Sequence, residues 1–291
     1  MNWDDIRIFL AVARSGQILG AARSLNLNHA TVARRLTALE TALGSTLFTR
    51  RTNGSDLSPS GERFLIHAER MESAMLAASE SAGADSAIDG TVRVGAPDGF
   101  GVAFLAPRLG ELTERHQGLR IELVPVPRAF SLSRREADIA VTLERPREGR
   151  LVARKLTDYR LGLYASKAYL DRYGTPARLA DLAAHRLVGY VEDLLYTASL
   201  DYTAEFLKGW HSALAVSSAM GQTEAVRAGA GIGILHAFMA GRDKDLVPVL
   251  PTHTLTRSYW TVVHEDLRAI SRVALVAEFL SEIVSRDRAI F

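Results

Sequence analysis

The sequence predicts a mixed fold: an all-α head that carries a small β-wing, one long helix, and an α/β region that fills the rest of the chain. Three short helical patterns occupy residues 1–44, and a hairpin and a proline-free stretch rich in Ala, Glu and Met follow them. From Thr91 onward, short apolar strands alternate with helices. A chain of 291 residues is long for one hydrophobic core, so two or three domains are expected.

The head is predicted from the spacing of its apolar residues. In "DDIRIFLAVAR" these recur at helical intervals, and Gly16 follows as a stop. "ILGAARSLN" is a short second helix, and "LNHATVARRLTALETALG" is a third, with Asn28 as its N-cap and Gly44 at its C-terminal end. Two helices in close succession, the second carrying exposed basic residues, indicate a helix-turn-helix.

The stretch "STLFTRRTNGSDLSPSG" predicts a β-wing. Leu47 and Phe48 are expected to form a buried strand, "TNGS" a hairpin turn, and Leu57 the start of the returning strand. One long helix is then expected from Glu62 to about Ala84, with "GADSAIDG" ending it at a domain boundary. Its spaced apolar positions suit either packing on its own domain or pairing with a second copy of the chain; they are Phe64, Leu65, Ala68, Met71, Met75 and Leu76.

The remaining sequence is typical of an α/β domain with largely parallel sheets. "TVRVGA", "RIELVPV" and "DIAVTL" are expected strands, and "GVAFLAPRLGELTERH" and "SLSRREA" are expected helices. The pattern continues through "RLGLYAS", "AVSSA", "TEAVRAGA", "GIGILHAF" and "YWTVVHE" to a final amphipathic helix, "AISRVALVAEFLSEIVSR".

Several classes of function are disfavoured by what the sequence lacks. Without Cys there is neither a disulfide framework nor a thiolate metal site, and the eight His residues show no metal-ligand spacing. No G-x-S-x-G motif occurs, and "GAGIGI" has Ile234 where a nucleotide-binding loop needs its last glycine. The acidic N-terminus does not resemble a signal peptide, and no apolar run would cross a bilayer. We therefore expect a cytoplasmic protein that is not an enzyme, with no catalytic residue, metal, cofactor or membrane partner.

The third helix places two arginines side by side. Because Val32, Leu36 and Leu39 would form its buried stripe together with Leu43, Arg34 and Arg35 are expected on the opposite face. Adjacent arginines usually belong to a solvated face, but here a short helix precedes them and a basic wing follows. Since arginine bonds guanine edges and phosphates, the pattern predicts a DNA interface. The predicted contacts are Asn28, His29, Thr31, Arg34 and Arg35 on the helix, and Arg50 and Arg51 on the wing.

The segment "FLAVARSGQILGAARSLNLNHATVARRLTALETALGSTLFTRRTNGSDLSPSGE" resembles the winged helix-turn-helix of LysR-type transcriptional regulators. The resemblance is carried by an alanine-rich second helix, by "LSPSG", and by Leu39-Glu40, Leu43-Gly44 and Leu47-Phe48 with Arg50. It continues more loosely through "ADIAVTL" and "AVRAGAGIGIL". Many relatives have Ser at the positions of Asn28 and Ala33, and Gln or Pro at those of His29 and Ala30, so the groove-facing side chains differ.

The resemblance implies three parts: a DNA-binding domain at 1–60, a linker and dimerisation helix at 61–89, and an effector-binding domain of periplasmic-binding-protein type at 90–291. Lobe one would span 91–161 and 264–291, and lobe two 162–263, with hinges near Leu161–Tyr164 and Tyr259–Val263. The linker helix would pair antiparallel in a homodimer, and two dimers would form a homotetramer on double-stranded promoter DNA.

A small-molecule effector is expected in the crevice at the carboxyl ends of the strands. The residues expected there are Asp98, Gly99, Phe100, Arg128, Phe130, Tyr190, Glu192, Ser217, Ser218 and Gln222. Ser217 and Ser218, before a helix, would offer hydroxyl and backbone N–H groups to an anion. Relatives that bind carboxylates often have Ser or Thr at the position of Asp98, so an acid there argues against a simple carboxylate effector unless Arg128 neutralises it.

The predicted function is therefore a LysR-type regulator whose promoter binding or DNA bending responds to an effector of unidentified chemistry. Two alternatives stay open. One is an effector-independent repressor with a vestigial pocket, and the other is a solute-binding or enzymatic α/β module with an incidental helical head.

Overall fold

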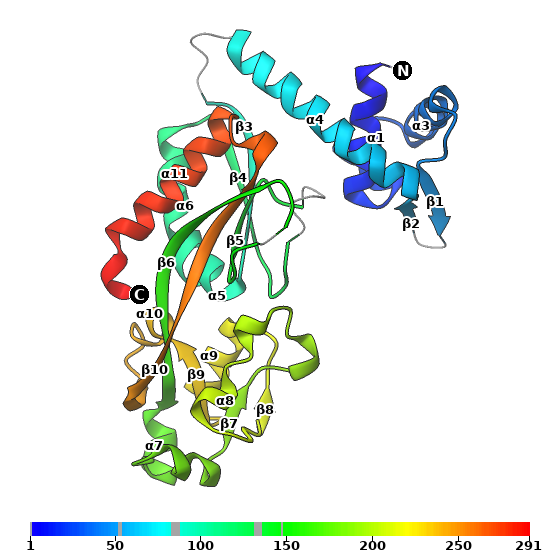
Figure 1. The fold of residues 1–291 in the computed structure, drawn as a ribbon. Helices are drawn as coiled ribbons and strands as arrows, with labels where there is room; N and C mark the ends of the chain where they lie inside the picture. The colour runs from blue at the N-terminus through cyan, green and yellow to red at the C-terminus, as the bar shows by residue number, and fades with distance from the viewer. Residues whose placement is uncertain (1, 52–53, 83–87, 131–135, 147) are drawn as a thin grey trace. The chain divides into compact units, whose positions relative to one another are not determined.

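A computed structural model describes residues 2–51, 54–82, 88–130, 136–146 and 148–291, which form two compact units (Figure 1). Of the described residues, the first unit comprises 2–51 and 54–82 together with Glu136 and 266–271, and the second comprises the others. Among the helices that the structure describes, none is both long and apolar enough to cross a membrane.

Three helices form the body of the first unit, as predicted: α1 (Trp3–Ser15), α2 (Ile18–Ser24) and α3 (His29–Leu43). Asn2 and Asp5 form a reciprocal capping box at the start of α1, and Gly16 ends that helix in the left-handed conformation, with φ +66°. The apolar faces of the three helices share one core around Phe9. The expectation of a four-residue buried stripe on α3 is wrong at one position, because Leu43 in the last turn is 36% exposed.

The wing consists of two antiparallel strands, β1 (Phe48–Arg51) and β2 (Gly54–Leu57), with Phe48 opposite Leu57. The expected turn "TNGS" includes residues 52 and 53, which lie outside the described part of the chain.

The long helix α4 (Pro59–Ala82) begins three residues earlier than expected. Ser58 explains this start, because its hydroxyl accepts the Gly61 N–H (2.9 Å) and donates to the Thr46 carbonyl (2.6 Å). Pro59 follows, and proline suits the first turn of a helix. The expected end of the helix at "GADSAIDG" lies mostly outside the described residues.

The second unit is built on one eight-stranded sheet in the order β4-β3-β5-β10-β6-β9-β7-β8 (Figure 1). Pairing is parallel at both ends of the sheet and antiparallel at its centre, where β10 runs against β5 and β6, and β6 runs against β9. The expectation of largely parallel pairing is therefore wrong for the strands at the centre of the sheet. The strands are β3 (Gly90–Ala96), β4 (Leu119–Pro125), β5 (Ile139–Thr142), β6 (Leu151–Ser166), β7 (Leu187–Gly189), β8 (Leu214–Ala215), β9 (Ile232–His236) and β10 (Leu246–His264).

Helices connect these strands and end the chain. They are α5 (Asp98–Phe100), a π-helical turn (Gly101–Leu105), α6 (Ala106–Arg115), α7 (Lys167–Tyr173), α8 (Thr203–Phe206), α9 (Ala219–Arg227), α10 (Ala237–Ala240) and α11 (Ser271–Arg286). The predicted helix "SLSRREA" falls mostly on residues outside the described part of the chain. In "AVSSA" the strand ends at Ala215, and Ser218 is the N-cap of α9.

Two long strands, β6 and β10, pair with each other and join two lobes of this unit (Figure 1). We call the part built on β3, β4 and β5 lobe one and the part built on β7, β8 and β9 lobe two. The segments expected as hinges belong to paired strands, since Leu161–Tyr164 pairs with β9 and Trp260–Val263 pairs with β5, and their hinge role stays a prediction. Between them, Thr157–Arg160 and Thr256–Tyr259 pair with each other, and this two-stranded stretch connects the lobes.

Candidate functional site

The start of α3 presents polar side chains on an exposed surface. Asn28 is the N-cap, as predicted, and its side-chain oxygen accepts the Ala30 N–H at 2.8 Å. His29 and Arg34 are exposed and Thr31 is half-buried. Asn28 therefore fixes the helix start, while His29, Thr31 and Arg34 are placed where a ligand can reach them.

Arg35 does not share the surroundings of Arg34. Its Nε donates to Asp5 Oδ1 at 2.9 Å, and its terminal nitrogens donate to Asp4 (3.3 Å) and Asn2 (3.1 Å). All three partners lie at the start of α1, and the Arg35 side chain is only 26% exposed. Arg35 therefore fastens α3 to α1, and the predicted DNA contact of this residue stays a prediction.

The sequence reasoning missed Glu40, which holds the wing on α3. Its Oε1 accepts the backbone N–H groups of Leu47 (2.7 Å) and Phe48 (3.2 Å), at the start of β1. In the sequence Glu40 marks only a family pattern, although an acid at the end of a helix can satisfy the N–H groups of a strand that follows it closely. The carboxylate thus sets the position of the wing relative to α3.

Replacing Glu40 with alanine is expected to destabilise the first unit by about 1–3 kcal/mol, because two N–H groups at the base of the wing lose a charged acceptor. Glu40→Gln keeps an acceptor oxygen and should lose clearly less. Calorimetric melting of the full chain checks this, and equal losses in the two variants would contradict the hydrogen-bonding role.

The backbone of both wing arginines lies in β1, where Arg50 is opposite Ser55 and Arg51 opposite Gly54. Their side chains lie outside the described part of the structure, so their predicted DNA contacts stay predictions.

In the second unit, Asp98 and Ser218 come together from different lobes. Asp98, Gly99 and Phe100 form α5, directly after β3 of lobe one. The Ser218 hydroxyl donates to Asp98 Oδ2 (2.7 Å), and the Met220 N–H donates to the same oxygen (3.1 Å). Asp98 is 7% exposed, so its carboxylate is a buried cap on the N-terminus of α9.

The other predicted effector residues make local contacts of their own. Gln222 is buried, and its Nε2 donates to the Val216 carbonyl at 3.0 Å, so it supports the loop before α9. The Arg128 guanidinium lies 5.2 Å from the Phe130 ring centroid and donates to Ala129. Of the rest, Tyr190 is buried, Ser217 is half-buried and Glu192 is exposed.

An aromatic wall beside Asp98 was not predicted. The Tyr259 ring lies 4.4 Å from Phe100 and 4.1 Å from Tyr159, and the Tyr159 ring lies 5.1 Å from His236. Burial raises the pKa of Tyr159 and Tyr259, and burial also lowers the pKa of His236 to about 4, so that this imidazole is neutral at pH 7. Together these rings form a buried stack along β6, β9 and β10.

Further polar contacts join the lobes away from Asp98. Glu144, just after β5, accepts hydrogen bonds from the Ser199 hydroxyl (2.8 Å) and N–H (3.0 Å) and from the Thr197 hydroxyl. Arg257 on β10 forms an ion pair with Glu205 of lobe two. Lobe one is thus held to lobe two by carboxylates at two places, Asp98 and Glu144.

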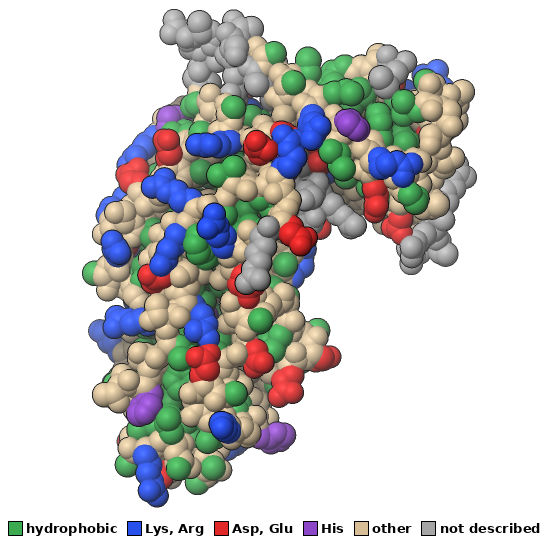
Figure 2. All heavy atoms as spheres, viewed as in Figure 1, with side chains coloured by type: hydrophobic (Ala, Val, Ile, Leu, Met, Phe, Trp, Pro, Cys, Tyr) green, Lys and Arg blue, Asp and Glu red, His purple; other side chains and the backbone are tan. Residues whose placement is uncertain are grey.

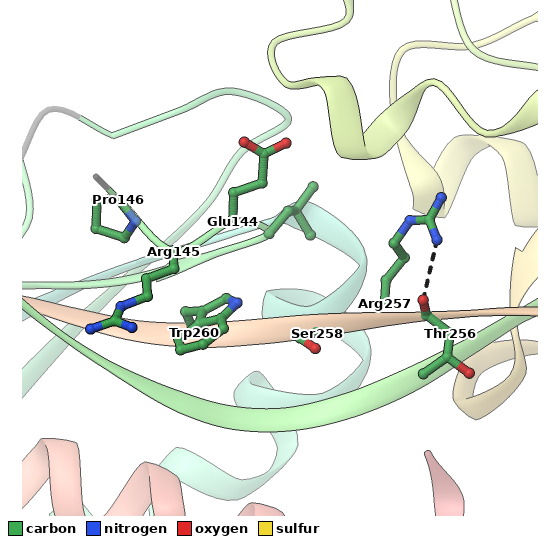
Figure 3. A pocket seen from close by; sticks show the side chains of 8 residues that line it. Glu144, Arg145, Pro146, Thr256, Arg257, Ser258 and Trp260 are labelled. Carbon is green, nitrogen blue, oxygen red and sulfur yellow. Dashed lines mark hydrogen bonds between the residues drawn. The ribbon is translucent and has the colours of Figure 1, made fainter. Parts of the chain in front are cut away.

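A cavity of about 680 Å³ lies where β5 ends beside β10. Figure 3 shows the Arg257 side chain on the right beside Thr256, and Glu144 on the left above Trp260 and Arg145. The Arg145 guanidinium lies 5.8 Å from the Trp260 ring. Its lining is Leu143, Glu144, Arg145, Pro146, Thr256, Arg257, Ser258 and Trp260, and none of these was among the predicted effector residues.

Within the described part of the chain, no cluster of His, Asp or Glu is arranged to hold a metal ion. Gly229 has φ +81° and turns the chain from α9 towards β9, as expected for a tight-turn glycine. Basic and acidic side chains are interspersed on the visible face of the second unit (Figure 2).

Comparison with known proteins matches both units. Residues 3–62 match the family described as "Bacterial regulatory helix-turn-helix protein, lysR family", and residues 86–284 match "LysR substrate binding domain". An HTH-type transcriptional regulator of Xanthomonas campestris pv. campestris is 32% identical over 184 residues, which are 63% of this chain and 54% of that protein.

A second relative, the HTH-type transcriptional regulator CrgA of Neisseria meningitidis serogroup C, is 29% identical and aligns with 97% of this chain and 96% of its own. The solved structure of CrgA from Neisseria meningitidis, a LysR-type transcriptional regulator, superposes with a TM-score of 0.62 at 27% identity, covering 97% of this chain and 98% of that one. The chain therefore belongs to the LysR family of bacterial transcriptional regulators.

Proposed function

We propose that Arg34, with His29 and Thr31, reads base edges in the major groove of promoter DNA, while Arg35 positions the reading helix. The proposal rests on the different surroundings of two adjacent arginines: Arg35 is hydrogen-bonded to the start of α1, whereas Arg34 is exposed. Asn28 stabilises the helix start, and Arg50 and Arg51 would hold the DNA backbone or reach the minor groove. Phosphate contacts fix position and base contacts specify sequence.

The linker helix α4 supports a homodimer. One side of it is buried in its own unit through Leu65, Ala68 and Phe64, whose ring lies 4.9 Å from that of Phe9. Farther along the helix the same stripe exposes Met71 and Met75, while Ile66, which is 52% exposed, lies on the opposite side. We infer that the stripe with Met71 and Met75 pairs with a second copy, so that two heads bind half-sites about 10 bp apart or a multiple of it. Two dimers would form a homotetramer.

An effector in the crevice between the lobes would change DNA affinity or bending by binding the two lobe arrangements unequally. The chain would act without catalysis. A second candidate, an effector-independent repressor, is favoured by the buried Asp98 carboxylate that already joins the lobes. A ligand-dependent rise in melting temperature would exclude this candidate.

The test compares Arg34→Ala, Arg35→Ala and wild type on the DNA upstream of the chain's own gene and on scrambled DNA, across a salt titration. Arg34→Ala should lose about 1–3 kcal/mol on the true site and little on scrambled DNA, because a base contact is removed. Arg35→Ala should weaken binding to both and lower the melting temperature of the first unit, because α3 loses its attachment to α1.

Arg120→Ala serves as a charge-matched control, since Arg120 is a well-exposed residue of β4 in the second unit. It should leave both DNA affinities unchanged. Suppose that Arg34→Ala loses affinity equally for the true site and for scrambled DNA, and that its log affinity falls less steeply with log salt concentration, by a slope difference of about one. Arg34 would then contact a phosphate and would not read a base. Absence of any sequence preference in wild type would contradict the proposed function.

A further inference from the structure

We propose that the crevice between the lobes selects a small organic cation, an amine with an apolar body, and that Asp98 is its counter-ion. The inference rests on the proposed effector-binding function and names the chemical class of the effector. It follows from three features of the crevice: where the Asp98 carboxylate lies, which rings surround it, and how the nearby basic side chains are already paired.

The Asp98 carboxylate lies where the two lobes meet, at the N-terminus of α9. The N-terminus of α9 offers the Met220 N–H and the Ser218 hydroxyl, and both donate to Asp98 Oδ2. A carboxylate effector would need these donors and would also lie beside a buried negative charge. Like charges at one buried site repel strongly, so the crevice disfavours simple carboxylates.

The surrounding aromatic side chains suit a cation. Five of the eight tyrosines belong to this region: Tyr159, Tyr190, Tyr196, Tyr202 and Tyr259. The Tyr259 hydroxyl is fully buried and has no hydrogen-bond partner among the described residues, so a ligand N–H can use it as an acceptor. Burial raises the pKa of Tyr190, Tyr196, Tyr202 and Tyr259, and the Asp98 carboxylate acts in the same direction.

The basic side chains near the crevice are already engaged with other groups. Arg257 is paired with Glu205 and donates to the Thr256 carbonyl. His236 is buried and neutral at pH 7. Among the described residues, Asp98 has no ion-pair partner, and both hydrogen bonds that it accepts are on Oδ2. Its Oδ1 is therefore available for a ligand ammonium group.

The experiment uses two probes with the same ring and opposite charge, benzylamine and benzoate, on the full chain. Calorimetric titration and melting should show that wild type binds benzylamine and not benzoate. Asp98→Asn keeps an acceptor for Ser218 and Met220 but removes the charge, so benzylamine affinity should fall about tenfold or more. Asp98→Ser frees the start of α9 and should allow benzoate to bind. Glu122→Gln, which removes a surface carboxylate from β4, should bind both probes as wild type does.

Binding of benzoate but not benzylamine by wild type would overturn the inference and leave an effector-binding regulator in place. Binding of neither probe, with operator binding intact, would also overturn it and favour the effector-independent repressor. Loss of sequence-specific operator binding would count against the proposed function itself. Melting of the unliganded variants shows whether each is folded, and unchanged benzylamine affinity in both folded Asp98 variants would overturn the role of Asp98.

Discussion

Replacing Gly61 with alanine is expected to destabilise the first unit by more than about 3 kcal/mol. Gly61 lies in the first turn of α4, where a Cβ atom would come within 2.1 Å of the Leu47 carbonyl oxygen. It would also lie 3.0 Å from Cδ2 of Leu57. The Leu47 carbonyl oxygen belongs to the backbone, so it cannot move aside by a change of rotamer. Either α4 or the wing must therefore shift.

Such a shift would break other contacts at the same junction. Ser58 bonds both Thr46 and the Gly61 N–H, and Glu40 holds the N–H groups of Leu47 and Phe48. The start of α4, the wing and α3 therefore form one packed junction. We expect DNA binding to be lost with the fold of this unit, because the wing and the reading helix depend on the same contacts.

Gly110→Ala is the matched control for this prediction. Gly110 also lies in a helix, α6, but a Cβ there meets nothing within 4 Å. The Gly110→Ala substitution should stabilise the second unit by about 0.5–1 kcal/mol, because alanine favours a helix more than glycine does. Calorimetry of the full chain, read transition by transition, checks both. A Gly61→Ala variant that melts within 2 °C of wild type, roughly half a kcal/mol for such a unit, would show that the junction adjusts easily.

The fold of the first unit was predictable because its signals are local. Asn28 caps α3 and Gly44 ends it, and both residue types adopt these conformations for reasons that depend on a few neighbours. Leu43 differs from this expectation. Helical spacing predicts that it is buried, but it lies in the last turn of α3 and its side chain is partly exposed.

The roles of Arg34 and Arg35 were not separable from the sequence. The two residues are chemically identical, and the partners of Arg35 lie about thirty positions earlier, at the start of α1. Only the packing of α1 against α3 brings Asp4 and Asp5 to this arginine. Helical periodicity reports the face of a residue, whereas tertiary packing decides what covers that face.

The sequence brought Asp98 and Ser218 into one predicted site, but it did not reveal the aromatic residues beside them. Asp98 and Ser218 were expected there because both lie near strand ends, and the structure joins them. Tyr159 and Tyr259 lie within the long strands β6 and β10, where nothing local distinguishes them from ordinary strand residues. The antiparallel pairing of these strands brings the two rings together, and that pairing was itself missed by the expectation of parallel sheets.

The second unit is expected to lose about 3 kcal/mol of stability between pH 6.5 and pH 4 through His236 alone. Burial lowers the pKa of His236 from 6.5 to about 4, with the nearby Asp98 carboxylate acting in the opposite direction. As pH falls below 6.5, the unfolded chain takes up a proton at this residue while the folded chain stays neutral. The stabilisation is therefore fully present above pH 6.5 and is lost as pH falls towards 4.

His236→Gln removes this titration, so the stability difference between wild type and variant should shrink by about 3 kcal/mol from pH 7 to pH 4. Carboxylates that titrate in the same range are common to both proteins and cancel in the difference. His253→Gln is the control, since His253 is exposed on β10 and its replacement should leave the pH dependence unchanged. A constant difference between wild type and His236→Gln across this range would mean that His236 takes up its proton at the same pH in the folded and in the unfolded chain, because the Asp98 carboxylate offsets the effect of burial.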